Sequence, residues 1–278
     1  MTCVLMGICL GIIFTVKTAQ MKYMADIKKE AEETGIELTF YQQGYTKAMS
    51  GMASGMIAFI NSLLVFVVRA ITSGERHETQ TKHNVSVAFK LLVARFLNSS
   101  LVLVLVNTNP NTWFRGGDLV YEATILIAIM AMQTPVLTIA NPVKLIRWYK
   151  KRKAIAEGEE CQLTQREANE LCEGPPIDIA NSISNYMNLI CTCIFYSPII
   201  PQAIPAALFG TVVNYWFSKY MLLRIHKMPE MFSGLMAQFF ANLMPLIILI
   251  WAFSFQYFIL SSKGANLKDN MIKKEIIK

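Results

Sequence analysis

Between residues 179 and 218 the chain carries no charged side chain. As one continuous helix this stretch would be roughly 60 Å long, about twice the hydrocarbon thickness of a bilayer. Proline interrupts helices because its nitrogen has no hydrogen to donate, and residues 197–205 contain Pro198, Pro201 and Pro205. The sequence therefore predicts two membrane spans joined by a proline-rich turn.

The composition extends this conclusion to the whole chain. Of its 278 residues, 54% are hydrophobic and only 16% are charged, with a mean hydropathy of +0.38. These values lie outside the range of ordinary soluble domains. The net charge of +7 sits mainly in short loops beside apolar stretches, where it controls topology, and we expect no nucleic-acid partner. We predict an all-α, multi-pass integral membrane protein.

We expect about seven transmembrane helices, some of them broken by proline. Residues 1–262 would form one pore-like helical domain, and residues 263–278 a polar tail. The predicted spans are residues 2–21, 48–71, 87–106, 118–141, 179–196, 199–221 and 231–260.

The loop at residues 143–177 gives the strongest orientation signal. It begins with six basic residues and no acid, so the positive-inside rule places it in the cytosol, where it can also contact lipid headgroups. Within it, Thr164 and Glu167 have the spacing of a capping box and predict a short helix. The expected headgroup contacts are Lys144, Arg147, Lys150, Lys151, Arg152 and Lys153.

Polar side chains inside the spans are the candidate functional residues, because such groups are costly in a bilayer unless they face protein or water. Lys90 lies near a span end and can extend to the interface. Arg95 lies deeper, and the sequence leaves open whether it lines a pore or pairs within the protein. The full set of expected pore-lining residues is Lys90, Arg95, Asn98, Gln133, Asn185, Asn188, Gln202, Asn214 and Ser218.

Neither catalysis nor metal binding is indicated. The six cysteines have no zinc-type spacing, and Cys191 and Cys193 lie on different faces of a helix. The three histidines, His77, His83 and His226, lie at loop edges without convergent partners. We expect no enzyme, no cofactor and no metal site.

Several runs of residues resemble one superfamily of membrane proteins. The run ERHETQT at residues 75–81, with Lys90 and the RFLN run at 95–98, resembles the anoctamins, which are calcium-activated chloride channels and lipid scramblases. The NPVKLIRWYKKRK run at 141–153 is similar to the basic exit of the next anoctamin helix. The runs that resemble OSCA-type osmosensitive channels and transmembrane channel-like (TMC) proteins are LTQ at 163–165, PID at 176–178, FYSPIIP at 195–201 and residues 215–223.

The resemblance covers most of residues 48–250 and implies the pore-helix region of this superfamily without its N-terminal cytosolic domain. It also shows departures at the anoctamin calcium ligands. Residues 132–136 contain no carboxylate, Asn185 and Asn188 replace a glutamate pair, and Asn214 and Ser218 replace an acid pair. Neutral amides bind calcium weakly, so we expect no direct calcium gating. Arg95 matches a basic pore position of the chloride-conducting members.

We therefore predict the pore domain of an ion channel that is gated by membrane tension or osmotic stress. Its partners would be membrane lipids and permeating ions, and a homodimer is compatible with the resemblance. Two alternatives stay open. One is an anoctamin-type phospholipid scramblase, because lipid headgroups could slide along the same polar groove. The other is a nonconducting membrane subunit or truncated paralogue, in which the amides only join helices.

Overall fold

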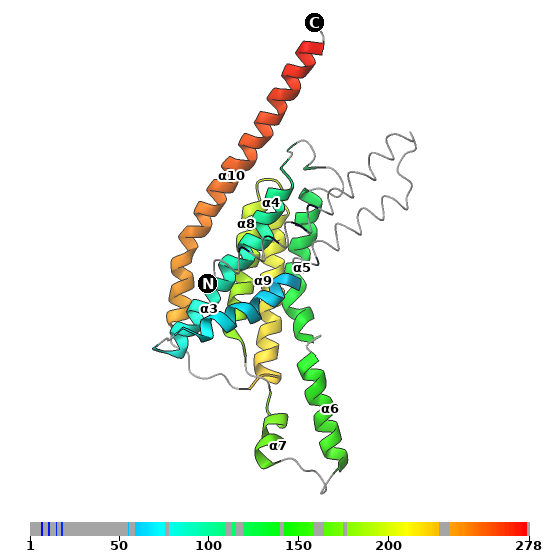
Figure 1. Ribbon diagram of the computed structural model, residues 1–278, viewed down its shortest axis with the longest axis vertical. Coiled ribbons are helices and arrows are strands. Elements are labelled where there is room, and N and C mark those ends of the chain that lie inside the picture. The colour runs from blue at the N-terminus through cyan, green and yellow to red at the C-terminus, as the bar shows by residue number, and fades with distance from the viewer. Residues whose placement is uncertain are drawn as a thin grey trace, which may run out of the picture.

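Helices make up the architecture of the computed structural model shown in Figure 1. The structure describes residues 59–75, 78–108, 110, 113–114, 119–139, 142–157, 164–174, 177–227 and 234–276, together with Gly7, Gly11, Thr15, Thr18 and Gly55. No strand occurs in this part of the chain, so the all-α class is confirmed for it.

Three helices among the described residues are long and apolar enough to cross a membrane: Gln80–Leu105, Leu119–Val136 and Met236–Ser261. These helices indicate that the chain associates with a membrane. A shorter apolar helix runs from Phe59 to Ser73 within the predicted span 48–71. The predicted span 2–21 and the first part of 48–71 lie outside the described residues, apart from isolated positions.

The span predicted at residues 87–106 is longer and less regular than expected. It consists of α3 (Gln80–Phe96), the π-helix η1 (Leu97–Leu101) and α4 (Val102–Val106), which run end to end. The helix begins seven residues before the predicted start because the Thr79 side chain caps it, accepting a hydrogen bond of 3.3 Å from the Lys82 N–H.

The next helices lead out of the bundle. α5 (Leu119–Ile139) closely matches the predicted span and contains Pro135. α6 (Pro142–Glu157) begins with proline at the first helical position, where its missing donor costs nothing. Figure 1 shows α6 and the short α7 (Gln165–Cys172) extending below the other helices.

The charge-free segment forms two helices joined by a turn, as predicted. α8 (Ile179–Tyr196) is capped by Asp178, and α9 (Ala203–Arg224) begins after the turn at residues 197–202. α8 and α9 have spanning length, but their amides and other polar residues keep them outside the set of three strongly apolar spans.

The last helix differs from the predicted boundary at residue 260. α10 (Leu235–Ile276) passes through Pro245 and continues through most of the expected polar tail. Its 42 residues give a length of about 63 Å, so it projects well beyond the other helices (Figure 1).

α8 occupies the centre of the bundle and packs against α3, α5, α9 and α10. Two buried hydrophobic clusters flank it. One joins α8 to the helix Phe59–Ser73, α3 and α10, and the other joins it to α4, α5 and the start of α9. Gly210 lets α9 approach α5 closely, because an added Cβ would lie 2.9 Å from the Cβ of Ala131.

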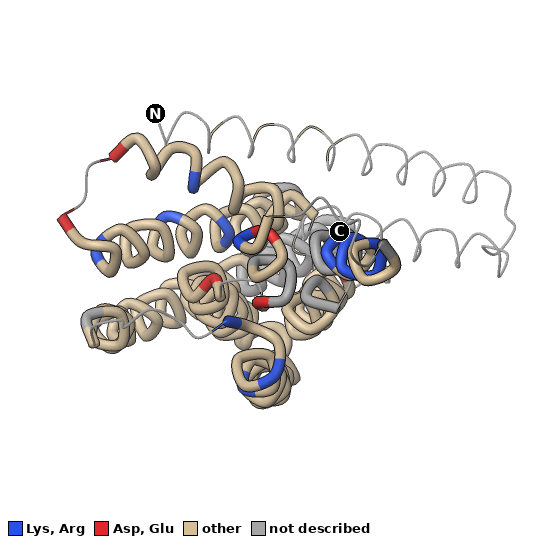
Figure 2. The backbone as a smooth tube through the Cα atoms, turned by 90° about the horizontal axis from the view of Figure 1, so that it is seen from below, with Lys and Arg blue, Asp and Glu red and all other residues tan. Residues whose placement is uncertain are grey.

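The outer faces of α9 and α10 are strongly apolar. Leu208 and Phe209 on α9, and Ile248, Leu249 and Phe253 on α10, are all more than half exposed. Viewed from the α6 and α7 end, the bundle carries few charged residues (Figure 2). Exposed apolar surface of this extent is expected where acyl chains surround a protein.

A close contact joins the connection before α8 to the end of α9. A Cβ added to Gly174 would lie 1.9 Å from the carbonyl oxygen of Ile225, so only glycine fits against this backbone. Next to it, the Glu173 carboxylate lies 3.4 Å from the Lys227 ammonium. The α7–α8 connection is therefore attached to the base of α9.

We predict that Gly210→Ala destabilises the fold. The new methyl group would meet Ala131 and cost about 1–3 kcal/mol through overpacking, which outweighs a gain of at most about 1 kcal/mol in helix propensity. Gly234→Ala is the control, because a Cβ there meets nothing within 4 Å. Thermal unfolding in detergent would measure both variants, and equal midpoints would contradict the close α5–α9 approach.

The predicted capping box is present at the start of α7. Glu167 accepts a bond of 2.9 Å from the Thr164 N–H and one of 2.8 Å from its hydroxyl. These bonds lower the pKa of Glu167 from 4.5. The cap therefore stabilises α7 above the unfolded-state pKa and is lost as the pH falls through the lowered value. We expect Thr164→Ala to raise this pKa only part of the way toward its ordinary value in a carboxyl NMR titration, because the backbone N–H bond remains and only the hydroxyl bond is removed. An unchanged pKa would contradict the hydroxyl bond to Glu167.

Candidate functional site

A row of polar side chains runs along one face of α8. Asn181, Ser184, Asn188 and Thr192 are separated by three, four and four residues, the spacing that places side chains on one side of a helix. Ser184, Asn188 and Thr192 are buried, and their hydroxyl and amide groups contact α3 and η1. This face is the base of the candidate site.

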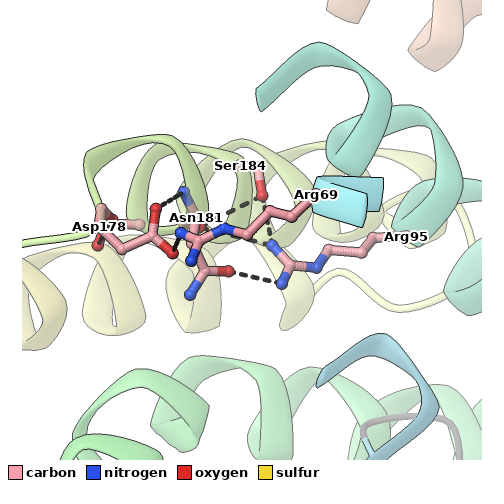
Figure 3. Close-up of polar contacts among 6 residues, drawn as sticks. Arg69, Arg95, Asp178, Asn181 and Ser184 are labelled. Atoms are coloured by element: carbon pink, nitrogen blue, oxygen red, sulfur yellow. Dashed lines mark hydrogen bonds and ion pairs between the residues drawn. The ribbon is translucent and has the colours of Figure 1, made fainter. Parts of the chain in front are cut away.

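Arg95 projects from α3 onto this polar face and is only 1% exposed. Its Nη2 donates to the Asn181 side-chain oxygen at 2.7 Å, and its Nη1 donates to the Ser184 hydroxyl and to the Asn181 carbonyl oxygen at 3.5 Å. Its Nε reaches the carbonyl oxygen of Asn61 at 3.4 Å. Figure 3 shows the guanidinium pointing at Asn181 and Ser184. Every one of these acceptors is electrically neutral.

The acid drawn beside this arginine in Figure 3 makes its contacts with other groups. Asp178 caps α8 by accepting from the Asn181 N–H at 3.1 Å, and its other oxygen forms an ion pair with Arg69. Both arginines are therefore linked to the first turn of α8 (Figure 3). Among the residues that the structure describes here, two cations and one carboxylate give this end of the site a net positive charge.

The π-helix η1 lies directly after Arg95 and is held by side-chain hydrogen bonds. The Ser99 hydroxyl donates to the Arg95 carbonyl oxygen at 2.7 Å, and the Ser100 hydroxyl donates to Thr192 at 3.0 Å. The buried Tyr196 hydroxyl donates to the Ser100 carbonyl oxygen at 2.8 Å. Irregular backbone needs such partners in a low-dielectric interior, and π-helical turns are frequent at functional sites.

Two amides at this level are only half satisfied. Asn98 Nδ2 donates to Asn61 Oδ1 at 2.6 Å, and the two side chains are 2% and 1% exposed. Within the described part of the chain, Asn61 Nδ2 and Asn98 Oδ1 have no hydrogen-bond partner. A buried polar atom without a partner is costly, so the pair can accept a water molecule or another polar group. We call the whole set the Arg95 network: Asn61, Arg95, Asn98, Ser99, Ser100, Asn181, Ser184, Asn188 and Thr192.

A second polar cluster lies between α5, α8 and α9. Asn214 donates through Nδ2 to the Ala131 carbonyl oxygen at 3.3 Å, while its Oδ1 has no partner among the described residues. The Tyr186 hydroxyl donates to the Asn214 carbonyl oxygen at 3.3 Å and also bonds the Ser218 hydroxyl. Asn214 and Ser218 thus do not join the Arg95 network.

The expected pore-lining residues are therefore distributed over several places. Arg95, Asn98 and Asn188 come together in the network, and Asn185 is half-buried on α8. Lys90 pairs with Glu75 at 2.5 Å, and Gln133 donates to the Ser62 hydroxyl at 3.2 Å. Gln202 is exposed in the turn before α9.

The expected headgroup contacts lie on α6. Lys150, Lys151, Arg152 and Lys153 are exposed and Arg147 is half-buried, while the side chain of Lys144 lies outside the described residues. Trp148 and Tyr149 are exposed among them, and Arg152 stacks 5.3 Å from the Trp148 ring centre. Aromatic and basic side chains together are typical of membrane interfaces.

Sequence reasoning missed several members of the site. The polar spacing on α8 was a usable signal for Asn181, Ser184 and Thr192, because it marks one helix face. The pairing of Asn61 with Asn98 had no local signal, since the two residues lie on different helices.

Among the residues that the structure describes, no group of three or more His, Cys, Asp or Glu side chains could hold a metal ion. The chain matches no protein-family model, and no curated protein matches its sequence.

We predict that Asn181→Ala destabilises the protein by about 1–3 kcal/mol, because it removes the side-chain oxygen that accepts from Nη2 of a buried guanidinium. Asn185→Ala is the matched control, being one turn away on α8 and outside the Arg95 network. Chemical or thermal unfolding in detergent would compare the two. If Asn185→Ala were the more damaging change, the described partners of Arg95 would be wrong.

Proposed function

We propose that this chain is a multi-pass membrane protein that forms the pore domain of an ion channel, opened by membrane tension rather than by direct calcium binding. The observation that carries the proposal is the buried Arg95 guanidinium, which is held by neutral oxygens beside a π-helix. A buried charge whose described hydrogen-bond acceptors are all neutral is rarely retained inside a membrane protein unless it has a functional role.

The conduction path that fits this geometry runs along the Arg95 network, between the helix Phe59–Ser73, α3–η1 and α8. The net positive charge near Arg95 favours anions, while the serines and amides can replace part of an ion's hydration shell. The unpaired atoms of Asn61 and Asn98 are additional sites where water can enter.

Opening would require the three helices to separate, because Arg95 and Asn98 side chains span the interface in the described conformation. The π-helix offers a place for that movement, since a π turn can revert to α-helical bonding and rotate the preceding residues. Membrane tension would favour the wider state, whose polar groups water would satisfy.

The α6 and α7 end fits the cytosolic side. The first turn of α3, the end of α9 and the start of α10 all lie toward the end where α6 and α7 extend (Figure 1). The basic α6 would then rest at the inner leaflet. We also propose that the other predicted spans, including residues 2–21, cross the membrane.

The test is a patch recording from proteoliposomes under suction in calcium-free solution. We expect stretch-evoked current with an anion preference in a salt gradient. Asn188→Asp adds a negative charge to the network and so disfavours anions relative to cations in the path. If their relative free energy changes by about 1–2 kcal/mol, the anion-to-cation permeability ratio should fall roughly 5–30-fold. Gln202→Glu is the control, because this residue is exposed in the turn before α9.

Arg95 provides the complementary variants. Arg95→Lys should keep the anion preference, whereas Arg95→Gln should weaken it. Equal effects of Asn188→Asp and Gln202→Glu would contradict the assigned path. A silent bilayer at all suctions would overturn the channel proposal for this chain.

The nonconducting subunit is the second candidate, and a specific observation favours it. The bonds of Arg95 join three helices, which is how polar groups stabilise helix association in membranes. This function predicts silence in the recording together with full loss of stability in Arg95→Gln.

A further inference from the structure

A pocket of ≈ 430 Å³ opens between the first turns of α3 and α10, away from the Arg95 network. Its size lies within the range of small-ligand sites. Val85, Phe89 and Phe239 supply apolar walls, and the two phenylalanine rings pack edge to face with centroids 5.8 Å apart. An acyl chain or another slender apolar group fits such a lining.

Polar groups also line this pocket. Gln238 and Asn242 lie one turn apart on α10, and Ser86 comes from α3. None of the three makes a side-chain hydrogen bond within the described part of the chain, and both amides are exposed. An exposed amide on a membrane helix is costly unless a partner satisfies it. The occupant must therefore carry hydrogen-bond acceptors next to its apolar chain.

Charged side chains at one end of the pocket further restrict the class of ligand that it can bind. Lys82 lines the pocket, and its ammonium pairs with Glu78, which lies four residues earlier, just before α3 begins. Both side chains are more than half exposed, at 54% and 81%. A cation and an anion four residues apart in the chain complement a headgroup that itself carries a phosphate and an ammonium.

We propose that this pocket binds a zwitterionic glycerophospholipid from the adjacent leaflet. Its phosphate contacts Lys82 and its ammonium group contacts Glu78. Its ester oxygens accept hydrogen bonds from Gln238 and Asn242, and one acyl chain lies along Phe89 and Phe239. The site is independent of ion conduction.

Photolabelling in phosphatidylcholine vesicles tests the assignment. A phosphatidylcholine with a diazirine near the ester end of one acyl chain is activated, and the labelled peptides are mapped by mass spectrometry. We expect several-fold more label on residues 85–89 and 238–242 than on Leu208, Phe209 and Val212 of α9, which are exposed and apolar. Equal labelling of both regions would mean ordinary surrounding lipid and would overturn the site.

Val85→Trp should fill the pocket and reduce its labelling several-fold, while the α9 label is unchanged. Leu208→Trp is the matched control on an exposed apolar position. If Val85→Trp fails to fold, as judged by helicity and gel filtration, Asn242→Leu removes an amide at similar size and should also lower the label. Unchanged labelling in the folded variant would overturn the proposal.

The headgroup is tested separately with a phosphatidylglycerol probe of the same chain length. We expect it to label the pocket less than the phosphatidylcholine probe does, and Glu78→Gln should reduce that difference. Equal or stronger labelling by the anionic lipid in the unmodified protein would overturn the zwitterionic assignment. These readouts measure lipid contact alone, so they remain valid whether or not the chain conducts ions.

Discussion

The buried guanidinium of Arg95 is the constraint on which the arrangement of the central helices depends. A charge in a low-dielectric interior must have its donors satisfied, and the acceptors here come from the helix Phe59–Ser73 and from α8. Because the fork of an arginine has fixed geometry, these bonds set how α3 is rotated and how far it is shifted along α8. The π-helix that follows accommodates Ser99 and Ser100 against Thr192 in the same register.

Around this centre, the rest of the bundle is held by close contacts between small residues and by apolar side chains. Lipid tails are as apolar as leucine, so hydrophobic burial alone cannot hold membrane helices together. The contact of Gly210 with Ala131 and the cluster around Asn214 supply the additional specificity between α5, α8 and α9. The outward faces of α9 and α10 keep their exposed large side chains for the surrounding lipid.

Much of this architecture was predictable from local sequence. The uncharged stretch and its prolines predicted α8, the turn and α9, and Thr164 with Glu167 predicted the start of α7. The start of α3 was missed because a hydropathy argument ignores the polar first turns that Thr79 caps. The helical continuation of α10 was missed for the same reason, since a charged segment can extend a helix beyond the membrane.

The grouping of the polar residues was harder to predict. Asn98, Asn188 and Asn214 look equivalent in the sequence, but the first two meet in one network and the third lies in another. Which amides meet depends on the rotation of each helix, and the apolar residues on all sides of α5 and α9 do not specify that rotation. Only the polar spacing on α8 carried this information.

The contact of Gly174 with Ile225, at the end of α9, allows α7 to transmit force to the bundle. Because Gly174 lies directly against the Ile225 backbone, α7 is connected to the start of α8 through a short and anchored link. The cap at Asp178 and the ion pair with Arg69 follow immediately along the chain. A protein or antibody fragment that binds α7 would therefore apply force to the first turn of α8. This force would reach the contacts of Arg95 although the ligand itself stays outside the lipid.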